Sequence, residues 1–227
     1  CAGYMRMYHH KYLELLREAC TKFNVHLIAD EIAVGFGRTG TMFGFEQAKI
    51  IPDIICLSKG ITGGYMTLST ILTTDDIYDA FYDEYEKLNA FLHSHSYTAN
   101  PIACSAANAT LNLFKNKKVI ENNKKLSLHM KKCFESLNDH PHVSDVRQKG
   151  MVLAVELVKN KKKKIAYDWK ERRGIKAYLH GLKNNVLMRP LGNVLYFMPP
   201  YVITKKEISF VSEIMKEGVD EATKKSS

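Results

Sequence analysis

Three short apolar runs constrain the fold of this 227-residue chain more than any other feature. They occupy residues 25–29, 54–57 and 68–72, and the first two end at Asp30 and at Ser58-Lys59-Gly60. Runs of this length fit buried strands, whereas a membrane span needs about 18 or more apolar residues. Because a helical apolar pattern over 12–23 precedes the first run, the chain is predicted to have an α/β fold with a sheet covered on both faces.

The pattern of predicted helices and strands changes near residue 117. Helices are predicted over 76–87, 102–114, 119–137, 167–184 and 205–222, and strands over 143–147, 151–158, 186–189 and 194–198. This pattern is typical of a smaller α+β domain following an α/β domain. We therefore predict two domains, at residues 1–116 and 117–227.

The distribution of charge and the cysteine content argue against several classes of protein. The excess of 33 Lys and Arg over 24 Asp and Glu gives a net charge of +9, but the lysines are spread over loops and polar helix faces without an RNA-binding aromatic motif or a helix-turn-helix. The five cysteines are odd in number and never spaced C-x-x-C, so neither a disulfide framework nor a zinc knuckle is indicated. We expect a cytoplasmic protein that binds neither nucleic acid nor membrane.

Two motifs suggest chemistry that their context does not support. Gly35-Phe-Gly-Arg-Thr-Gly40 matches the dinucleotide fingerprint, but two carboxylates separate it from the preceding strand and no amphipathic helix follows. The histidine pairs at 9–10, 93–95 and 140–142 lack a carboxylate or cysteine at a matching interval. We therefore expect surface or hydrogen-bonding histidines and no metal site.

Asp30 and Lys59 form the more informative pair, since each follows a predicted strand. Lys59 lies between Ser58 and Gly60, which leaves room for a group bonded to its amine, as a Schiff base requires. A carboxylate nearby would keep a pyridine nitrogen protonated. On the residues alone, a structural ion pair is the favoured interpretation of these two side chains.

The context of this pair resembles a known family. Residues 27–40 (LIADEIAVGFGRTG), 52–54, 58–60 and 63–64 are similar in order and spacing to the cofactor-attachment signature of the class III aminotransferases, which use pyridoxal 5'-phosphate (PLP). The resemblance implies fold type I of the PLP-dependent transferases. On this basis, 1–116 is the carboxyl-terminal part of a large domain with a mostly parallel sheet, and 117–227 is the small α+β domain.

The same resemblance assigns candidate site residues. Lys59 would hold PLP as a Schiff base and act as general base, Asp30 would contact the pyridine nitrogen, and Ile32 would pack on the ring. His95 and Ser96 correspond to residues that reach the cofactor phosphate of the neighbouring subunit in a homodimer. Ser94, Arg189 and Tyr196 correspond to substrate-binding positions, with Arg189 receiving a carboxylate.

Further motifs refine the expected activity. Residues 5–8, 188–190 and 196–201 resemble family members that transfer the amino group of S-adenosylmethionine to 8-amino-7-oxononanoate in biotin synthesis. The alternatives are a class III enzyme that uses an ω-amino acid, ornithine or 4-aminobutyrate, or an inactive subunit that only dimerises. The chain starts at Cys1 without Met and resembles only the carboxyl-terminal half or slightly more of the family, without its phosphate-binding Gly-Ser turn, so we expect a fragment.

Overall fold

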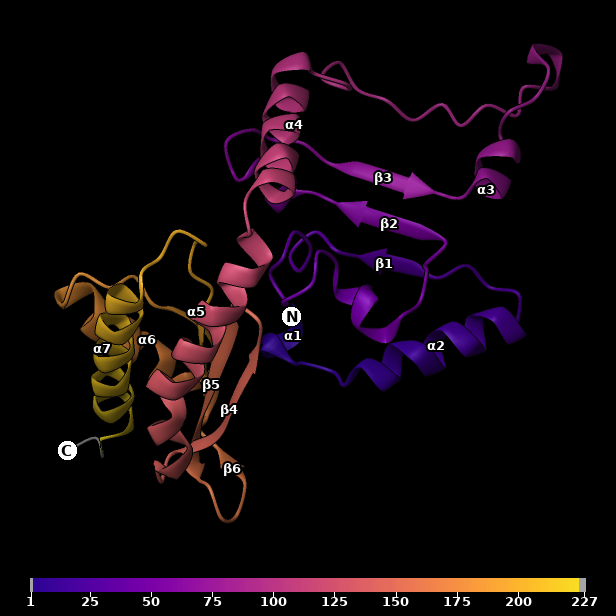
Figure 1. The fold of residues 1–227 in the computed structure, drawn as a ribbon. Helices are drawn as coiled ribbons and strands as arrows, with labels where there is room; N and C mark the ends of the chain where they lie inside the picture. The colour runs from indigo at the N-terminus through magenta and orange to yellow at the C-terminus, as the bar shows by residue number, and fades with distance from the viewer. Residues whose placement is uncertain (1, 225–227) are drawn as a thin grey trace. The chain divides into compact units, whose positions relative to one another are not determined.

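The computed structural model describes residues 2–224, which form two compact units. One unit comprises residues 8–118, and the other comprises residues 119–224 together with 2–7. Figure 1 shows the elements of both units. The assignment of these parts to a large and a small domain of the family stays a prediction.

A three-stranded sheet organises the unit of residues 8–118. Its strands are β1 (Ile28–Asp30), β2 (Ile54–Leu57) and β3 (Thr70–Thr73). They lie side by side in the order β1-β2-β3, with β1 parallel and β3 antiparallel to β2 (Figure 1). The other elements are α2 (His10–Lys22), α3 (Asp75–Asp79), α4 (Pro101–Asn116) and the 3-10 helices η1 (Gly44–Ala48), η2 (Lys59–Thr62) and η3 (Tyr85–Lys87).

The single helix predicted over 76–87 is wrong. Its place is taken by α3 and η3 with irregular chain between them. Tyr78, Phe81 and Tyr82 are all exposed, so a longer helix would have no packed apolar face to stabilise it. Short helices depend on such tertiary packing, because the free energy gained from the hydrogen bond of a first turn is smaller than the entropy cost of ordering its residues.

Helix α4 begins where the sequence indicated. Asn100 Oδ1 accepts hydrogen bonds from the backbone N–H groups of Ile102 (3.0 Å) and Ala103 (3.1 Å), and Pro101 occupies the first turn. Ala107 of α4 packs into a small core with Phe36. The remaining core members are Leu57 and Ile61.

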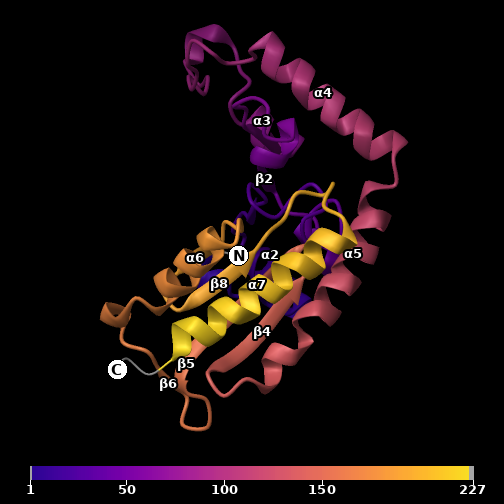
Figure 2. The ribbon, with the colours of Figure 1, turned by 90° about the vertical axis from the view of Figure 1, so that its left-hand side faces the viewer.

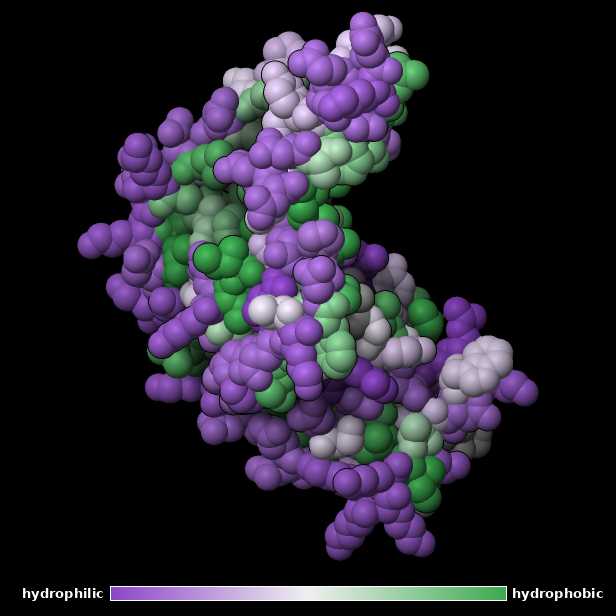
Figure 3. Space-filling model, turned by 90° about the vertical axis from the view of Figure 1, so that its right-hand side faces the viewer, coloured by the Kyte–Doolittle hydropathy of each residue, from purple (hydrophilic) through white to green (hydrophobic). Residues whose placement is uncertain are grey.

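Many other apolar side chains of this unit are exposed, including Ile28, Ile71, Phe91 and Leu92. Figure 3 shows apolar surface among the polar surface of the molecule. The strands predicted to be buried on both faces are therefore only partly covered within this chain.

An antiparallel sheet organises the other unit. Its strands run in the order β4-β5-β8-β7, and β6 pairs with β5. The strands are β4 (Val143–Lys149), β5 (Val152–Asn160), β6 (Ile165–Ala166), β7 (Arg189–Leu191) and β8 (Val194–Phe197). The helices are α1 (Ala2–Met5), α5 (Val119–Phe134), α6 (Arg173–Lys183) and α7 (Lys205–Thr223), with η4 (Glu135–Asp139) and η5 (Trp169–Glu171).

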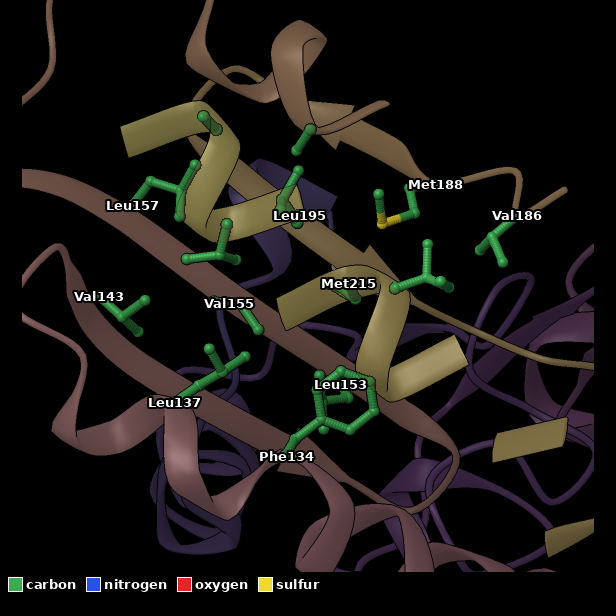
Figure 4. Packing of buried hydrophobic residues seen from close by; sticks show 14 of the residues in the cluster. Phe134, Leu137, Val143, Leu153, Val155, Leu157, Val186, Met188, Leu195 and Met215 are labelled. Carbon is green, nitrogen blue, oxygen red and sulfur yellow. The ribbon is translucent and has the colours of Figure 1, made fainter. Parts of the chain in front are cut away.

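Both faces of β5 are buried, which explains why its sequence is almost continuously apolar. Leu153 and Val155 point to the face covered by α5, α6 and α7, and these helices lie side by side in front of the strands in Figure 2. Figure 4 shows Phe134 and Met215 among the side chains packed between those helices and the sheet. Residues 2–7 cover the opposite face, where Met5 packs against other residues of the strands.

The chain before β7 differs from the sequence prediction. The strand predicted at 186–189 is wrong, because Val186 and Met188 fill the core from irregular chain and β7 begins only at Arg189.

Arg147 fixes the amino-terminal segment by donating to the carbonyls of Met5 (2.8 Å) and Tyr4 (2.6 Å). Within residues 2–224, no helix is long and apolar enough to cross a membrane.

Candidate active site

The carboxyl ends of the parallel strands β1 and β2 bring Asp30 and Lys59 to one edge of the sheet. Asp30 is paired in register with Cys56, and Lys59 begins η2 three residues after Cys56. Glu31 N–H donates to Cys56 O at 3.0 Å, which extends the pairing past the end of β1. Both side chains are exposed. Carboxyl ends of parallel strands are the usual place for a binding site in an α/β sheet.

The backbone at Lys59 is unusual for a residue with a side chain. Its φ is +47°, in the left-handed region that favours glycine. Neighbouring hydrogen bonds hold this conformation, since Ser58 Oγ donates to Leu68 O at 2.7 Å and Thr62 Oγ1 donates to Met66 O at 2.6 Å. Backbone strain of this kind often accompanies functional sites, where the surroundings over-determine the conformation.

Gly60 is required by a close approach to Phe36. A Cβ atom at Gly60 would lie 2.9 Å from Phe36 Cδ2 and 3.0 Å from Phe36 Cβ. Phe36 is itself only 2 % exposed, so its ring has little room to move. The contact therefore fixes the start of η2, and with it the base of the Lys59 side chain.

Asp30 is held by the chain that follows it. Its Oδ1 accepts a hydrogen bond from Ile32 N–H at 3.0 Å, which closes an Asx turn. This bond orients the carboxylate and brings half-buried Ile32 next to it. The predicted trio of Asp30, Ile32 and Lys59 thus belongs to one continuous edge.

Glu31 is a buried carboxylate whose importance the sequence did not reveal. Its Oε2 accepts from Gly44 N–H at 2.9 Å and its Oε1 from Phe45 N–H at 3.0 Å. Burial raises the pKa of Glu31, while these two backbone hydrogen bonds oppose that change. A Cβ atom at Gly35 would lie 2.8 Å from Glu31 O, so the chain packs closely around this residue. No local sequence pattern points to Glu31, because its two partners lie thirteen and fourteen residues further along the chain.

The glycines at 35, 37 and 40 belong to this loop. The segment is a series of turns that leads to η1, and it opens no amphipathic helix. Gly37 N–H donates to Met42 O at 3.1 Å, which closes the loop on itself. Its geometry is that of a connection wrapped around the Glu31 carboxylate.

Ser94, His95 and Ser96 lie in the exposed connection between η3 and α4. His95 Nδ1 accepts from Tyr97 N–H at 3.1 Å, and His95 N–H donates to Thr98 Oγ1 at 3.1 Å. Figure 1 shows this connection as an extended segment that leads back to α4. Within residues 2–224, no hydrogen bond or ion pair joins these three residues to Asp30 or Lys59.

Arg189 and Tyr196 face each other across the β7–β8 hairpin. They are register partners, and the guanidinium carbon of Arg189 lies 6.0 Å from the centroid of the Tyr196 ring. An arginine over an aromatic face is oriented by the ring quadrupole and keeps its N–H donors available. Arg189 is exposed and Tyr196 is half-buried. The hairpin thus presents a cation and an aromatic ring together.

The histidines make hydrogen bonds of several kinds. His9 Nδ1 accepts from Lys11 N–H at the start of α2, and His140 Nε2 lies 3.1 Å from Asp220 Oδ1. Among residues 2–224, no group of three or more His, Cys, Asp or Glu side chains is arranged to hold a metal ion.

The family model described as "Aminotransferase class-III" matches residues 1–219 of this chain. The chain belongs to the class III aminotransferases. An adenosylmethionine-8-amino-7-oxononanoate aminotransferase from Helicobacter pylori is 46% identical to this class III chain over 228 residues. That match covers 99% of the chain and 50% of the relative, so the chain spans about half the length of the curated relatives it matches.

Solved structures agree with this family assignment. The crystal structure of adenosylmethionine-8-amino-7-oxononanoate aminotransferase from Methanocaldococcus jannaschii has a TM-score of 0.91 and 41% identity, covering 96% of this chain and 50% of that one. The ω-transaminase from Pseudomonas jessenii in complex with PMP has a TM-score of 0.88 and 28% identity, covering 94% and 47%. The predicted family and its α/β, type I fold are confirmed, whereas the roles of the individual site residues stay predictions.

Proposed function

We propose that this class III chain supplies the lysine-bearing part of a PLP-dependent aminotransferase. The enzyme would transfer the amino group of S-adenosylmethionine to 8-amino-7-oxononanoate and form 7,8-diaminononanoate. The observation that carries the proposal is the placement of Asp30 and Lys59 after adjacent parallel strands. The names of relatives at 46% and 41% identity support the choice of substrates.

The residues at this edge fit PLP. Lys59 offers an exposed amine for the aldehyde, Asp30 offers a carboxylate for the pyridine N–H, and Ile32 offers an apolar side chain for the ring. The Asx turn at Asp30 and the tight contact at Gly60 hold the first two groups in place. When bound, PLP supplies an electron sink for the amino-bearing carbon of the substrate.

Lys59 would also move the proton that transamination requires. Its neutral amine would take a proton from the α carbon of the amino donor in the first half of the reaction, and it would deliver a proton to the carbon that becomes aminated in the second half. The carboxylate of Asp30 would keep the pyridine nitrogen protonated throughout. Both roles would be served from the carboxyl ends of neighbouring strands, where these two residues lie.

Arg189 would receive a substrate carboxylate. A guanidinium forms two parallel hydrogen bonds to a carboxylate, and the position of the Arg189 guanidinium over the Tyr196 ring would pre-orient it for that task. We also propose that the protein is a cytoplasmic homodimer. In that dimer, the exposed residues Ser94, His95 and Ser96 would serve the site of the neighbouring subunit.

The test uses the whole protein that contains this chain. Purified protein is supplied with PLP and 8-amino-7-oxononanoate, and 7,8-diaminononanoate is measured with S-adenosylmethionine, ornithine, 4-aminobutyrate or an ω-amino acid as donor. We expect product with S-adenosylmethionine only. Lys59→Ala should abolish turnover, whereas Lys87→Ala, which removes an exposed lysine paired with Asp83, should leave it unchanged.

Each outcome decides between the alternatives. Turnover of ornithine or 4-aminobutyrate without S-adenosylmethionine would identify another class III activity. Absence of turnover with every donor would indicate a subunit that is not catalytic by itself. Normal turnover by the Lys59→Ala variant would contradict the proposed site.

A further inference from the structure

Glu31 is a buried carboxylate that the proposed mechanism does not use. Its exposed fraction is 4%, and among residues 2–224 it is the one acidic residue that is buried. Burying a charged group costs free energy unless the group is hydrogen-bonded. Every polar group of Glu31 is bonded: its N–H donates to Cys56 O at 3.0 Å, its C=O accepts from Gly35 N–H at 2.8 Å, and its carboxylate oxygens accept from Gly44 and Phe45.

The hydrogen bonds of Glu31 close the loop of residues 32–43. Its main chain begins the loop directly after β1, and its carboxylate accepts from Gly44 N–H at 2.9 Å and from Phe45 N–H at 3.0 Å, where η1 begins. Both ends of the loop are therefore fixed to a single residue. A carboxylate that accepts from backbone N–H groups forms charge-assisted hydrogen bonds, which are stronger than those between neutral groups.

The start of this loop contacts Asp30. Ile32 N–H donates to Asp30 Oδ1 at 3.0 Å, and Glu31 N–H holds the same stretch of chain against β2 through Cys56 O. Asp30 is thus held between β2 and the loop. The orientation of its carboxylate depends on where the loop begins.

The remainder of the loop contacts the segment that begins at Lys59. The ring of Phe45 stacks on Phe43 with the centroids 5.6 Å apart, and Phe43 meets Phe36 edge to face at 5.8 Å. Phe36 packs against Gly60, where a Cβ atom would lie 2.9 Å from its ring. A continuous series of contacts therefore joins the Glu31 carboxylate to the backbone at Lys59. Because protein interiors are close-packed, a shift at one end of this series displaces the other end.

We propose that Glu31 is a positioning residue that sets the distance and orientation between the Asp30 carboxylate and the Lys59 amine. It acts through the loop of residues 32–43 and does not itself contact the cofactor. The inference rests on the proposed function, in which these two groups meet the pyridine nitrogen and the aldehyde of one PLP molecule. Small displacements of binding groups from the productive geometry are costly, so a weaker Glu31 anchor should weaken PLP binding.

Asp53 provides a matched control, because it anchors the other end of β1. Its Oδ2 accepts from Leu27 N–H at 2.6 Å and from the Arg17 guanidinium at 2.7 Å. Both carboxylates fix β1 to the surrounding chain, but of the two only Glu31 lies at the end that carries Asp30. A purely structural role predicts similar effects on the cofactor from the two residues, whereas a positioning role predicts an effect from Glu31 alone.

The experiment compares Glu31→Gln with Asp53→Asn in the whole protein. Glutamine has the size of glutamate but a single acceptor oxygen, so it can accept from one of the two backbone N–H groups and leaves the other without a partner. PLP is titrated into protein from which it has been removed, and binding is followed by absorbance. We expect the Kd for PLP to rise about tenfold in Glu31→Gln, as for the loss of one charge-assisted hydrogen bond, and to change by less than about twofold in Asp53→Asn.

Two further readouts separate positioning from a loss of stability. The circular dichroism of bound PLP at saturation reports the orientation of its ring, and we expect it to change in Glu31→Gln and not in Asp53→Asn. Hydrogen exchange of the cofactor-free proteins should be faster over residues 32–45 in Glu31→Gln than in wild type or in Asp53→Asn.

Gly44→Ala is a milder second variant of the same contact. Its Cβ atom would lie 3.2 Å from Glu31 Oε1, so it presses on the carboxylate without removing the charge. It should also raise the Kd for PLP, by less than Glu31→Gln does. If Glu31→Gln does not fold, Gly44→Ala takes its place in every comparison.

Wild-type PLP affinity and circular dichroism in the Glu31 variant would overturn the inference. Borohydride trapping of PLP on Lys59 in the same samples would then show that the proposed cofactor site still stands. An equal rise in Kd in Asp53→Asn would also overturn the inference, because the effect would then be one of general stability. Absence of PLP from Lys59 in the wild-type protein would contradict both the inference and the proposed function.

Discussion

The two units of this chain bury their apolar residues to very different extents. In the unit of residues 119–224 and 2–7, Leu153, Val155 and Leu195 are at most 1% exposed beneath the helices. In the unit of residues 8–118, the strand residues Ile28 and Ile71 are 58% and 65% exposed. Burying one such side chain contributes roughly 1.5–3 kcal/mol to the free energy of unfolding. The unit of residues 8–118 therefore lacks several of these contributions within the chain.

This difference shows that the candidate active site depends on local contacts more than on a large core. Asp30 is held by an Asx turn, Lys59 by the contacts of η2, and the loop between them by the Glu31 carboxylate. The apolar face that carries Ile28 and Ile71 is free to pack against further protein surface. Substitutions in each unit therefore test whether the difference in burial determines stability.

The largest effect is expected from the well-packed unit. Phe134→Ala should lower the free energy of unfolding by about 3–5 kcal/mol, because Phe134 is fully buried and the variant leaves a cavity. Phe91→Ala, at a position 70% exposed, should change it by less than about 0.5 kcal/mol. Urea titrations followed by circular dichroism measure both values. Equal losses in the two variants would show that the burial contrast does not determine stability.

A smaller effect is expected at the tight contact beneath the site. Gly60→Ala should cost about 1–3 kcal/mol, because the new Cβ would meet the Phe36 ring at 2.9 Å. The same substitution should cost less in a Phe36→Leu background, where the ring is removed. A double-mutant cycle measures this coupling, and strictly additive costs would contradict the proposed contact.

The smallest effects concern two carboxylates in the unit of residues 8–118. Burial raises the pKa of Glu31, so its contribution to stability is full below the unfolded value of about 4.5 and is lost as pH rises through the folded value. The hydrogen bonds from Leu27 N–H and from Arg17 lower the pKa of Asp53. Its contribution is therefore present above the unfolded value of about 3.8 and is lost as pH falls through the folded value.

The free energy of unfolding is measured at pH values from about 3 to about 7, one unit apart. Its dependence on pH then separates the opposite contributions of Glu31 and Asp53. Glu31→Gln should remove a decline in stability above about pH 4.5, and Asp53→Asn should remove a loss below about pH 3.8. The slopes are compared rather than the absolute values, because each amide also changes a hydrogen bond. An unchanged slope in either variant would contradict the corresponding assignment.

The sequence was sufficient where the structure depends on local patterns. The apolar runs placed Asp30 and Lys59 after neighbouring strands, and Asn100-Pro101 marked the start of α4. It was insufficient where contacts come from distant residues. Glu31 is buried by amides thirteen and fourteen residues away, and the segment over 76–87 lacks the packing partner that its apolar residues suggested. The roles of Ser94, His95 and Ser96 depend on contacts outside their own loop and stay predictions.

Borohydride trapping tests the central claim most directly. The whole protein is incubated with PLP, reduced with sodium borohydride, digested, and searched by mass spectrometry for a phosphopyridoxyl group. The account predicts modification of Lys59 and loss of the label in Lys59→Ala. Scattered labelling, or a label confined to another lysine, would contradict the assignment of the cofactor site to the ends of β1 and β2.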